Sequence, residues 1–138
     1  MGLEKKLIDL ENAFSRLRQS YDRAFETKGS KDFEFFRDST IQRFEFNVEI
    51  LWKTIKEFLS SKEGVECRTP KSCIREFFVA GYLTPEDTKI LLEIIDYRNL
   101  TSHTYHEEIA DKIFEKLKIY IPTMQKAINK IKEHLQNL

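Results

Sequence analysis

Turn-forming residues, net charge and long apolar runs are all scarce in this 138-residue sequence. Four glycines and three prolines leave little room for strands and the turns between them. The 23 Lys and Arg residues equal the 23 Asp and Glu residues, so no net charge draws the protein to nucleic acid or membrane. No stretch approaches the roughly 18 apolar residues of a membrane span, and no signal peptide is visible. We therefore expect a cytoplasmic protein with no membrane partner.

Cysteine and histidine are equally sparse. Cys67 and Cys73 lie outside any Cys-x-x-Cys spacing and flank a predicted turn, so we expect neither a disulfide framework nor a zinc site. His103 and His106 form the only closely spaced histidine pair, and no convincing third ligand accompanies them. The sequence therefore predicts no metal and no cofactor.

Apolar residues recur at steps of three and four along most of the chain, which predicts an all-α protein. The pattern predicts long helices over residues 3–25, 41–58 and 109–135. Thr69-Pro70 and Thr84-Pro85 predict the starts of two shorter helices, because threonine caps a helix and proline suits its first position. Pro122 should kink or break the last helix. About five helices with short connections predict an up-and-down antiparallel bundle, in a single domain over residues 1–138.

The second long helix has more aromatic residues than one core should need. Phe44, Phe46, Trp52 and their neighbours give this helix two apolar faces. Exposed patches of this kind tend to mark interfaces between proteins. The sequence therefore predicts a homodimer.

The segment Arg98-Asn99-Leu100-Thr101-Ser102-His103-Thr104-Tyr105 lies between the last two predicted helices. It combines a permanent cation, a side chain that titrates near neutrality and a phenol. Thr104, three residues before Glu107, predicts a capping box for the last helix. The alternative interpretation is an arginine facing its helix dipole, a surface histidine and a half-buried tyrosine.

This segment has the groups needed for metal-free RNA cleavage. A guanidinium fork suits phosphate geometry, and the start of the last helix favours anions. His103 would deprotonate the ribose 2′-hydroxyl, and Arg98 would stabilise charge on the phosphorus. Since the chain has no net charge, RNA affinity would need a local cluster of cations. The last helix offers one, although such a pattern is more often a solvated helix face: Lys112, Lys116, Lys118, Lys126, Lys130 and Lys132.

Arg98-x4-His103-x-Tyr105, with Asn99 after the arginine, resembles the motif of HEPN-domain proteins. More narrowly, it resembles the proteins that are paired with a minimal nucleotidyltransferase (MNT). Residues 38–52 resemble the second helix of that family, and residues 69–81 resemble its third. The family consists of homodimeric helical bundles similar to the C-terminal helical domain of kanamycin nucleotidyltransferase. Its members were first described as nucleotidyltransferase substrate-binding proteins, and later as HepT-like toxins of MNT/HEPN toxin–antitoxin pairs.

The resemblance implies a role for each residue of the motif. Arg98 and His103 would be the catalytic pair of an endoribonuclease, and Asn99 would support them by hydrogen bonding. Tyr105 would accept AMP from the partner nucleotidyltransferase, and this modification would silence the toxin. The bulky anion on Tyr105, two residues from His103, would repel an RNA phosphate. The chain has no nucleotidyltransferase carboxylates of its own, so that chemistry would belong to a separate polypeptide.

Three functions remain open on the sequence. The first is an RNA-cleaving toxin neutralised by a cognate nucleotidyltransferase antitoxin, and the intact Arg98/His103 pair favours it. The second is a non-catalytic subunit that binds a nucleotide or acceptor for the nucleotidyltransferase. The third is a purely structural dimeric bundle, in which Arg98 and His103 matter only for stability.

Overall fold

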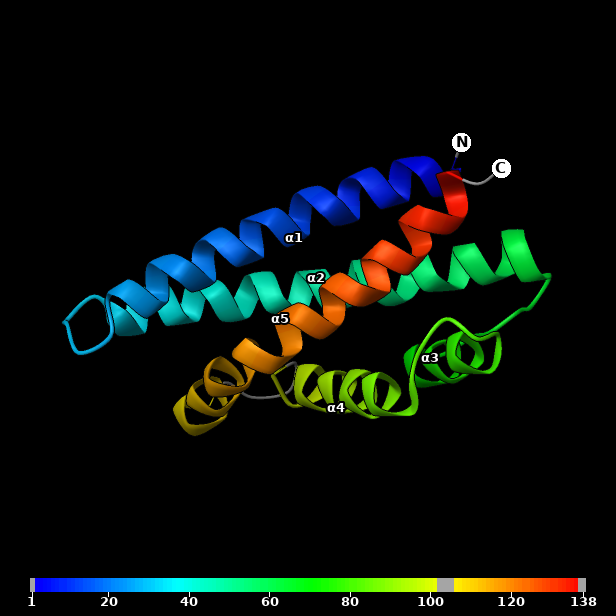
Figure 1. Cartoon of the computed structure of the whole chain (residues 1–138). Coiled ribbons are helices and arrows are strands. Elements are labelled where there is room, and N and C mark those ends of the chain that lie inside the picture. The colour runs from blue at the N-terminus through cyan, green and yellow to red at the C-terminus, as the bar shows by residue number, and fades with distance from the viewer. Residues whose placement is uncertain (1, 102–105, 137–138) are drawn as a thin grey trace.

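The computed structural model describes residues 2–101 and 106–136, and the regular structure within them is helical throughout. Five helices follow one another along the chain: α1 (Gly2–Glu26), α2 (Phe33–Glu63), α3 (Pro70–Val79), α4 (Pro85–Thr101) and α5 (Glu107–Gln136). They form an antiparallel bundle in which α1, α2 and α5 are long and α3 and α4 are short (Figure 1). The predicted all-α class and bundle architecture are confirmed.

Helix α2 is the centre of the bundle, because it contacts each of the other four helices. Helix α1 runs along one side of α2, α3 and α4 lie on the other side, and α5 crosses over α2 (Figure 1). The start of α1 and the end of α5 meet at one end of the bundle, where Lys132 Nζ lies 3.2 Å from Glu11 Oε2. No described helix is both long and apolar enough to cross a membrane.

The apolar stripes of the five helices meet in one core. Phe44 is completely buried and stacks on Tyr120, with 6.2 Å between the ring centroids. The Tyr120 hydroxyl donates to Glu93 (2.5 Å), and burial together with this bond raises the pKa of Tyr120. Phe44 therefore belongs to the core and cannot contribute to the predicted homodimer interface.

Both short helices begin at their predicted caps. The Thr69 hydroxyl accepts from the Ser72 N–H (3.2 Å), and the Ser72 hydroxyl accepts from the Thr69 N–H (3.0 Å), which completes a capping box before Pro70. At the start of α4, the Thr84 hydroxyl accepts from the Asp87 N–H (3.0 Å). These local bonds satisfy amides that a helix leaves unpaired at its first turn.

The prediction that Cys67 and Cys73 form no disulfide was wrong. They are bonded to each other, their Cα atoms are 5.2 Å apart, and both side chains are buried. The chain turns at Thr69 and enters α3 within the five residues that separate them, so the first helical turn brings Cys73 back towards Cys67. The bond closes the turn that leads from α2 into α3.

The suggested break at Pro122 does not occur. Helix α5 continues through Pro122 from Glu107 to Gln136. A proline inside a helix removes the hydrogen bond to the carbonyl four residues earlier. Here Pro122 and Lys118 both lie on the exposed side of α5, so water can satisfy the Lys118 carbonyl.

Candidate functional site

Arg98 lies in the last turn of α4, on the face that packs against α2. Ile94 and Ile95, four and three residues earlier, are both buried, and helical spacing places Arg98 beside them. The Arg98 side chain is only 25% exposed. Its positive charge near the carboxyl end of α4 is stabilised by the helix dipole.

Arg98 lines a small pocket between α2, α3 and α4, with a volume of about 250 Å³. We call it the Arg98 pocket, and it is lined by Val48, Glu49, Trp52, Pro70, Ile95, Arg98 and Asn99. The structure thus brings Asn99, the predicted supporting residue, to the same pocket as Arg98. The sequence had assigned Trp52 to a homodimer interface and had given no role to Glu49, although their three-residue spacing on one helix placed them on one face.

The charge of Arg98 is only partly balanced. Arg98 Nη2 lies 3.4 Å from Glu49 Oε2. The other oxygen of Glu49 lies 3.4 Å from Lys53 Nζ, so one carboxylate is shared by two cations. This corner of the pocket retains positive charge that can attract an anion.

Two buried N–H donors of the Arg98 pocket have no acceptor among the described residues. They are Nε of Arg98 and the indole Nε1 of Trp52. Buried donors are nearly always hydrogen-bonded, because a desolvated donor without a partner costs about 1–3 kcal/mol. Both side chains line the Arg98 pocket, and a phosphodiester is rich in the acceptor oxygens that such donors lack.

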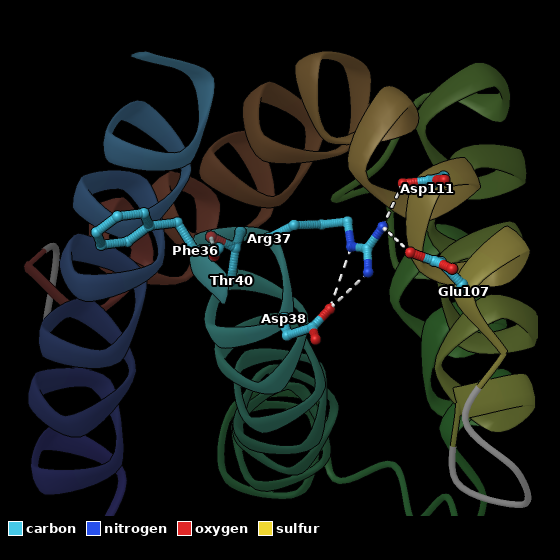
Figure 2. A network of polar contacts seen from close by, with 6 residues as sticks. All are labelled: Phe36, Arg37, Asp38, Thr40, Glu107 and Asp111. Atoms are coloured by element: carbon cyan, nitrogen blue, oxygen red, sulfur yellow. Dashed lines mark hydrogen bonds and ion pairs between the residues drawn. The ribbon is translucent and has the colours of Figure 1, made fainter. Parts of the chain in front are cut away.

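A second arginine, Arg37, ties α2 to the first two turns of α5. Its guanidinium reaches from α2 towards α5 between three carboxylates (Figure 2). Nη1 donates to Asp111 (2.7 Å) and lies 3.6 Å from Glu107, while Nε and Nη2 donate to Asp38 (3.1 and 3.0 Å). The Arg37 side chain is only 4% exposed. We call this set the Arg37 network, and it fixes the part of α5 that directly follows the motif.

The remaining motif residues, His103 and Tyr105, lie outside the described residues, as does Thr104 with its predicted cap. The flanks of this segment are described. Thr101 ends α4, and its hydroxyl donates to the Arg98 carbonyl (2.7 Å). The His106 carbonyl accepts from the N–H groups of Ile109 and Ala110 (3.1 and 3.0 Å) as α5 begins. The segment therefore connects the end of α4, which carries Arg98, to the end of α5 that Arg37 holds.

The lysines of α5 offer less free charge than their number suggests. Lys116 pairs with Glu93 (3.5 Å), Lys126 with Asp87 (3.6 Å) and Lys132 with Glu11 (3.2 Å). Half of the six lysines are thus balanced by carboxylates of other helices. This favours the solvated helix face over an RNA-binding cluster on α5.

The bundle has the fold of HEPN toxins. A tri-AMPylated HEPN toxin from Shewanella oneidensis, solved in complex with an MNT antitoxin, is similar with a TM-score of 0.76 and 15% identity. The match covers 95% of this chain and 96% of that one. A mutant of the MntA–HpeT toxin–antitoxin pair is similar with a TM-score of 0.75 and 15% identity, over 95% of this chain and 97% of the other.

Sequence similarity defines the family. The family model "nucleotidyltransferase substrate binding protein like" matches residues 5–133, so the chain belongs to this family. A protein from Thermus thermophilus with a crystal structure is 35% identical, with a TM-score of 0.78 over 88% of this chain and 98% of that one. No curated protein matches the sequence.

Proposed function

We propose that this protein is the HEPN-type toxin partner of a separate minimal nucleotidyltransferase antitoxin, and that it cleaves RNA without a metal ion. The observation that carries the proposal is the Arg98 pocket. It has a partly balanced guanidinium and two buried donors without acceptors among the described residues, and its Arg98 precedes His103 by five residues in the sequence. A phosphodiester supplies the negative charge and the acceptor oxygens that this pocket lacks.

In the proposed reaction, neutral His103 takes the proton of a ribose 2′-hydroxyl. The 2′-oxygen attacks the adjacent phosphorus, and the bond from phosphorus to the 5′-oxygen breaks. The departing 5′-oxygen takes a proton from solvent, which leaves a 2′,3′-cyclic phosphate and a 5′-hydroxyl. Arg98 stabilises the extra negative charge on the pentacoordinate phosphorus, and Asn99 supports the pair by hydrogen bonding.

Tyr105 is the proposed site of regulation. Its phenol oxygen would attack the α-phosphorus of ATP bound to the partner enzyme, and pyrophosphate would leave. The resulting AMP places an anion two residues from His103, where it repels an RNA phosphate. The tri-AMPylated state of the Shewanella oneidensis HEPN toxin supports this form of regulation.

The second candidate is a non-catalytic subunit that binds the nucleotide or acceptor of a nucleotidyltransferase. The description of the family, as substrate-binding proteins, favours it. The same pocket would then hold a nucleotide phosphate without cleaving RNA. Arg98→Ala would weaken nucleotide binding in this case, and no RNA would be cut by the wild-type protein.

We also propose that the protein is a cytoplasmic homodimer. An exposed phenylalanine of α2 supports the homodimer, since Phe35 is 76% exposed. A monomer in sedimentation equilibrium at micromolar concentration would contradict this proposal. Disulfides are rare in a reducing cytoplasm, so Cys67 and Cys73 would be buried thiols there.

The test of the proposed function is RNA cleavage by the purified protein in EDTA, with His103→Ala as the comparison. Expression without the partner leaves Tyr105 unmodified, so silencing cannot explain a negative result. We expect the wild-type protein to cleave RNA and the variant to be inactive. Equal cleavage by both would contradict the role of His103, and cleavage of no RNA class by either would favour the substrate-binding subunit.

A further inference from the structure

A groove follows the line of contact between α1 and α2. It consists of two adjoining hollows of about 350 and 280 Å³, and both are lined by Arg16 and Arg43. We call it the α1–α2 groove. The residues of its lining that matter here are Arg16, Arg23, Phe36, Arg43, Phe46 and Asn47.

The three arginines of this groove are exposed and form no ion pair within the part of the chain that the structure describes. The arginines that do form ion pairs there are Arg37 and Arg98. Asp9, the acidic residue at one end of the groove, is already 3.5 Å from Lys5 Nζ. The protein has no net charge, yet positive charge without a partner is concentrated along this groove.

Aromatic rings lie beside these arginines. The Arg23 guanidinium lies over the Phe36 ring, 5.4 Å from its centroid. Phe46 lines the other hollow, and its side chain is largely open to solvent. Arginines that follow a backbone, together with rings on which bases stack, are typical of surfaces that bind single-stranded nucleic acid.

A buried amide lies beneath the groove. Asn47 is completely buried, and its Nδ2 donates to the carbonyls of Ala13 (3.0 Å) and Arg43 (2.7 Å). Its Oδ1 has no donor among the described residues. The bond to the Ala13 carbonyl joins α2 to α1 beneath the groove and fixes the spacing of the two helices that carry its arginines.

The groove and the Arg98 pocket lie on either side of the exposed face of α2. Arg43, Phe46 and Glu49 follow one another at three-residue steps across this face, and they are about 120° apart around the helix from first to last. Arg43 and Phe46 line the groove, whereas Glu49 lines the Arg98 pocket. The six residues from Arg43 to Glu49 correspond to about 9 Å along the helix axis. On α1, the groove extends from Asp9 to Arg23, or about 21 Å.

We propose that the α1–α2 groove binds single-stranded RNA and holds the substrate strand while its scissile phosphate occupies the Arg98 pocket. This inference rests on the proposed function, because it assumes that RNA is the substrate. Arg16, Arg23 and Arg43 contact phosphates, and bases stack on Phe36 and Phe46. Phe46 must then stay open, so the homodimer contact of α2 falls at Phe35, which does not line the groove.

The test is binding of a fluorescent single-stranded oligouridine to full-length protein that carries His103→Ala, so that the probe is not cut. In that background we compare Arg16→Gln/Arg43→Gln with Arg68→Gln/Arg75→Gln. All four arginines are exposed and lack ion pairs among the described residues, but the second pair lies outside the groove. Thermal unfolding of each variant shows whether its fold is retained.

We expect the groove variant to bind about tenfold or more weakly, with a salt dependence reduced by about 1.4 in the slope of log K against log salt, for two lost phosphate contacts. The control variant should bind within about twofold of its parent, since it loses no phosphate contact. Equal weakening in both variants, unchanged binding in the groove variant, or a preference for oligothymidine over oligouridine would overturn the proposal.

RNA binding by the groove variant and RNA cleavage by the wild-type protein test the groove and the nuclease separately. Weaker binding by the groove variant, together with no cleavage by the wild-type protein, would support the groove and contradict the nuclease. Cleavage by the wild-type protein, together with unchanged binding by the groove variant, would support the nuclease and contradict the groove.

Discussion

Arg37 and Arg98 use the same side chain in opposite ways. Arg37 is almost completely buried, and its guanidinium lies within 3.6 Å of the carboxylates of Asp38, Glu107 and Asp111. Arg98 is a quarter exposed and meets one carboxylate, Glu49, at 3.4 Å, and its buried Nε has no acceptor among the described residues. The charge of Arg37 is balanced by carboxylates of the protein, whereas the charge of Arg98 is only partly balanced.

This contrast separates a structural role from a binding role. A buried guanidinium that is surrounded by carboxylates contributes to the fold, because its removal would leave those carboxylates near one another without a cation. A guanidinium with an unpaired donor in a pocket can still gain by meeting an acceptor. We therefore expect Arg37 to determine stability and Arg98 to determine activity.

The largest expected effect is on stability, in Arg37→Met. The variant leaves three carboxylates around an apolar side chain, and each of them is about half exposed, which softens the penalty. We expect a loss of about 2–4 kcal/mol in the free energy of unfolding, measured with urea. Arg43→Met, at an exposed arginine without an ion pair among the described residues, is the control and should change it by no more than about 0.5 kcal/mol. A similar loss in the free energy of unfolding for both variants would show that Arg37 has no special role in stability.

The next effect is on activity, in Arg98→Lys. Lysine keeps the positive charge but loses the planar fork and Nε. We expect RNA cleavage to fall by roughly 100-fold, as for the loss of a donor that stabilises a transition state. The free energy of unfolding should change by less than about 1 kcal/mol, because the ion pair with Glu49 is partly solvated. A loss of stability comparable to that of Arg37→Met would assign Arg98 to the fold.

A smaller effect is expected for Trp52→Phe, which removes the indole N–H and keeps an aromatic ring in the pocket. If Trp52 donates to the substrate, kcat/KM should fall by about tenfold, the equivalent of one hydrogen bond. Because this donor is unpaired in the free protein, stability should stay the same or rise slightly. Unchanged kcat/KM would show that the indole N–H does not contact RNA.

The smallest effect is expected for Glu49→Gln. The substitution removes the carboxylate that Arg98 and Lys53 share, and with it a negative charge that opposes a phosphate. KM for RNA should decrease by about twofold in low salt, with kcat unchanged, since exposed charges contribute little at longer range. A lower kcat would instead give Glu49 a part in the reaction.

Most of the fold could be predicted because its signals are local. Steps of three and four between apolar residues identify the long helices, and Thr69-Pro70 and Thr84-Pro85 define the starts of α3 and α4 by bonds within one turn. Arg98 and Asn99 could be assigned to one site because they are neighbours in the chain, next to a helix end.

The missing parts depend on contacts that no local pattern encodes. Arg37 and Asp111 are 74 residues apart, so the burial of Arg37 follows only from the packing of α2 against α5. The role of Trp52 follows from the position of α4 beside α2. The disulfide of Cys67 and Cys73 needed the turn into α3, which a spacing of six residues does not reveal. Ion pairs between helices also reduce the free charge of the lysine-rich α5, whereas Arg16, Arg23 and Arg43 on α1 and α2 form none among the described residues.

The most direct measurement of the central claim is the chemistry of the RNA ends. Wild-type protein would be incubated with an oligonucleotide of defined sequence in EDTA, and the products analysed by mass spectrometry. The account predicts 2′,3′-cyclic phosphate and 5′-hydroxyl ends from the wild-type protein, and intact oligonucleotide with Arg98→Ala and with His103→Ala. Products with 5′-phosphate ends, or cleavage that persists in either variant, would contradict the assignment of Arg98 and His103 as the catalytic pair.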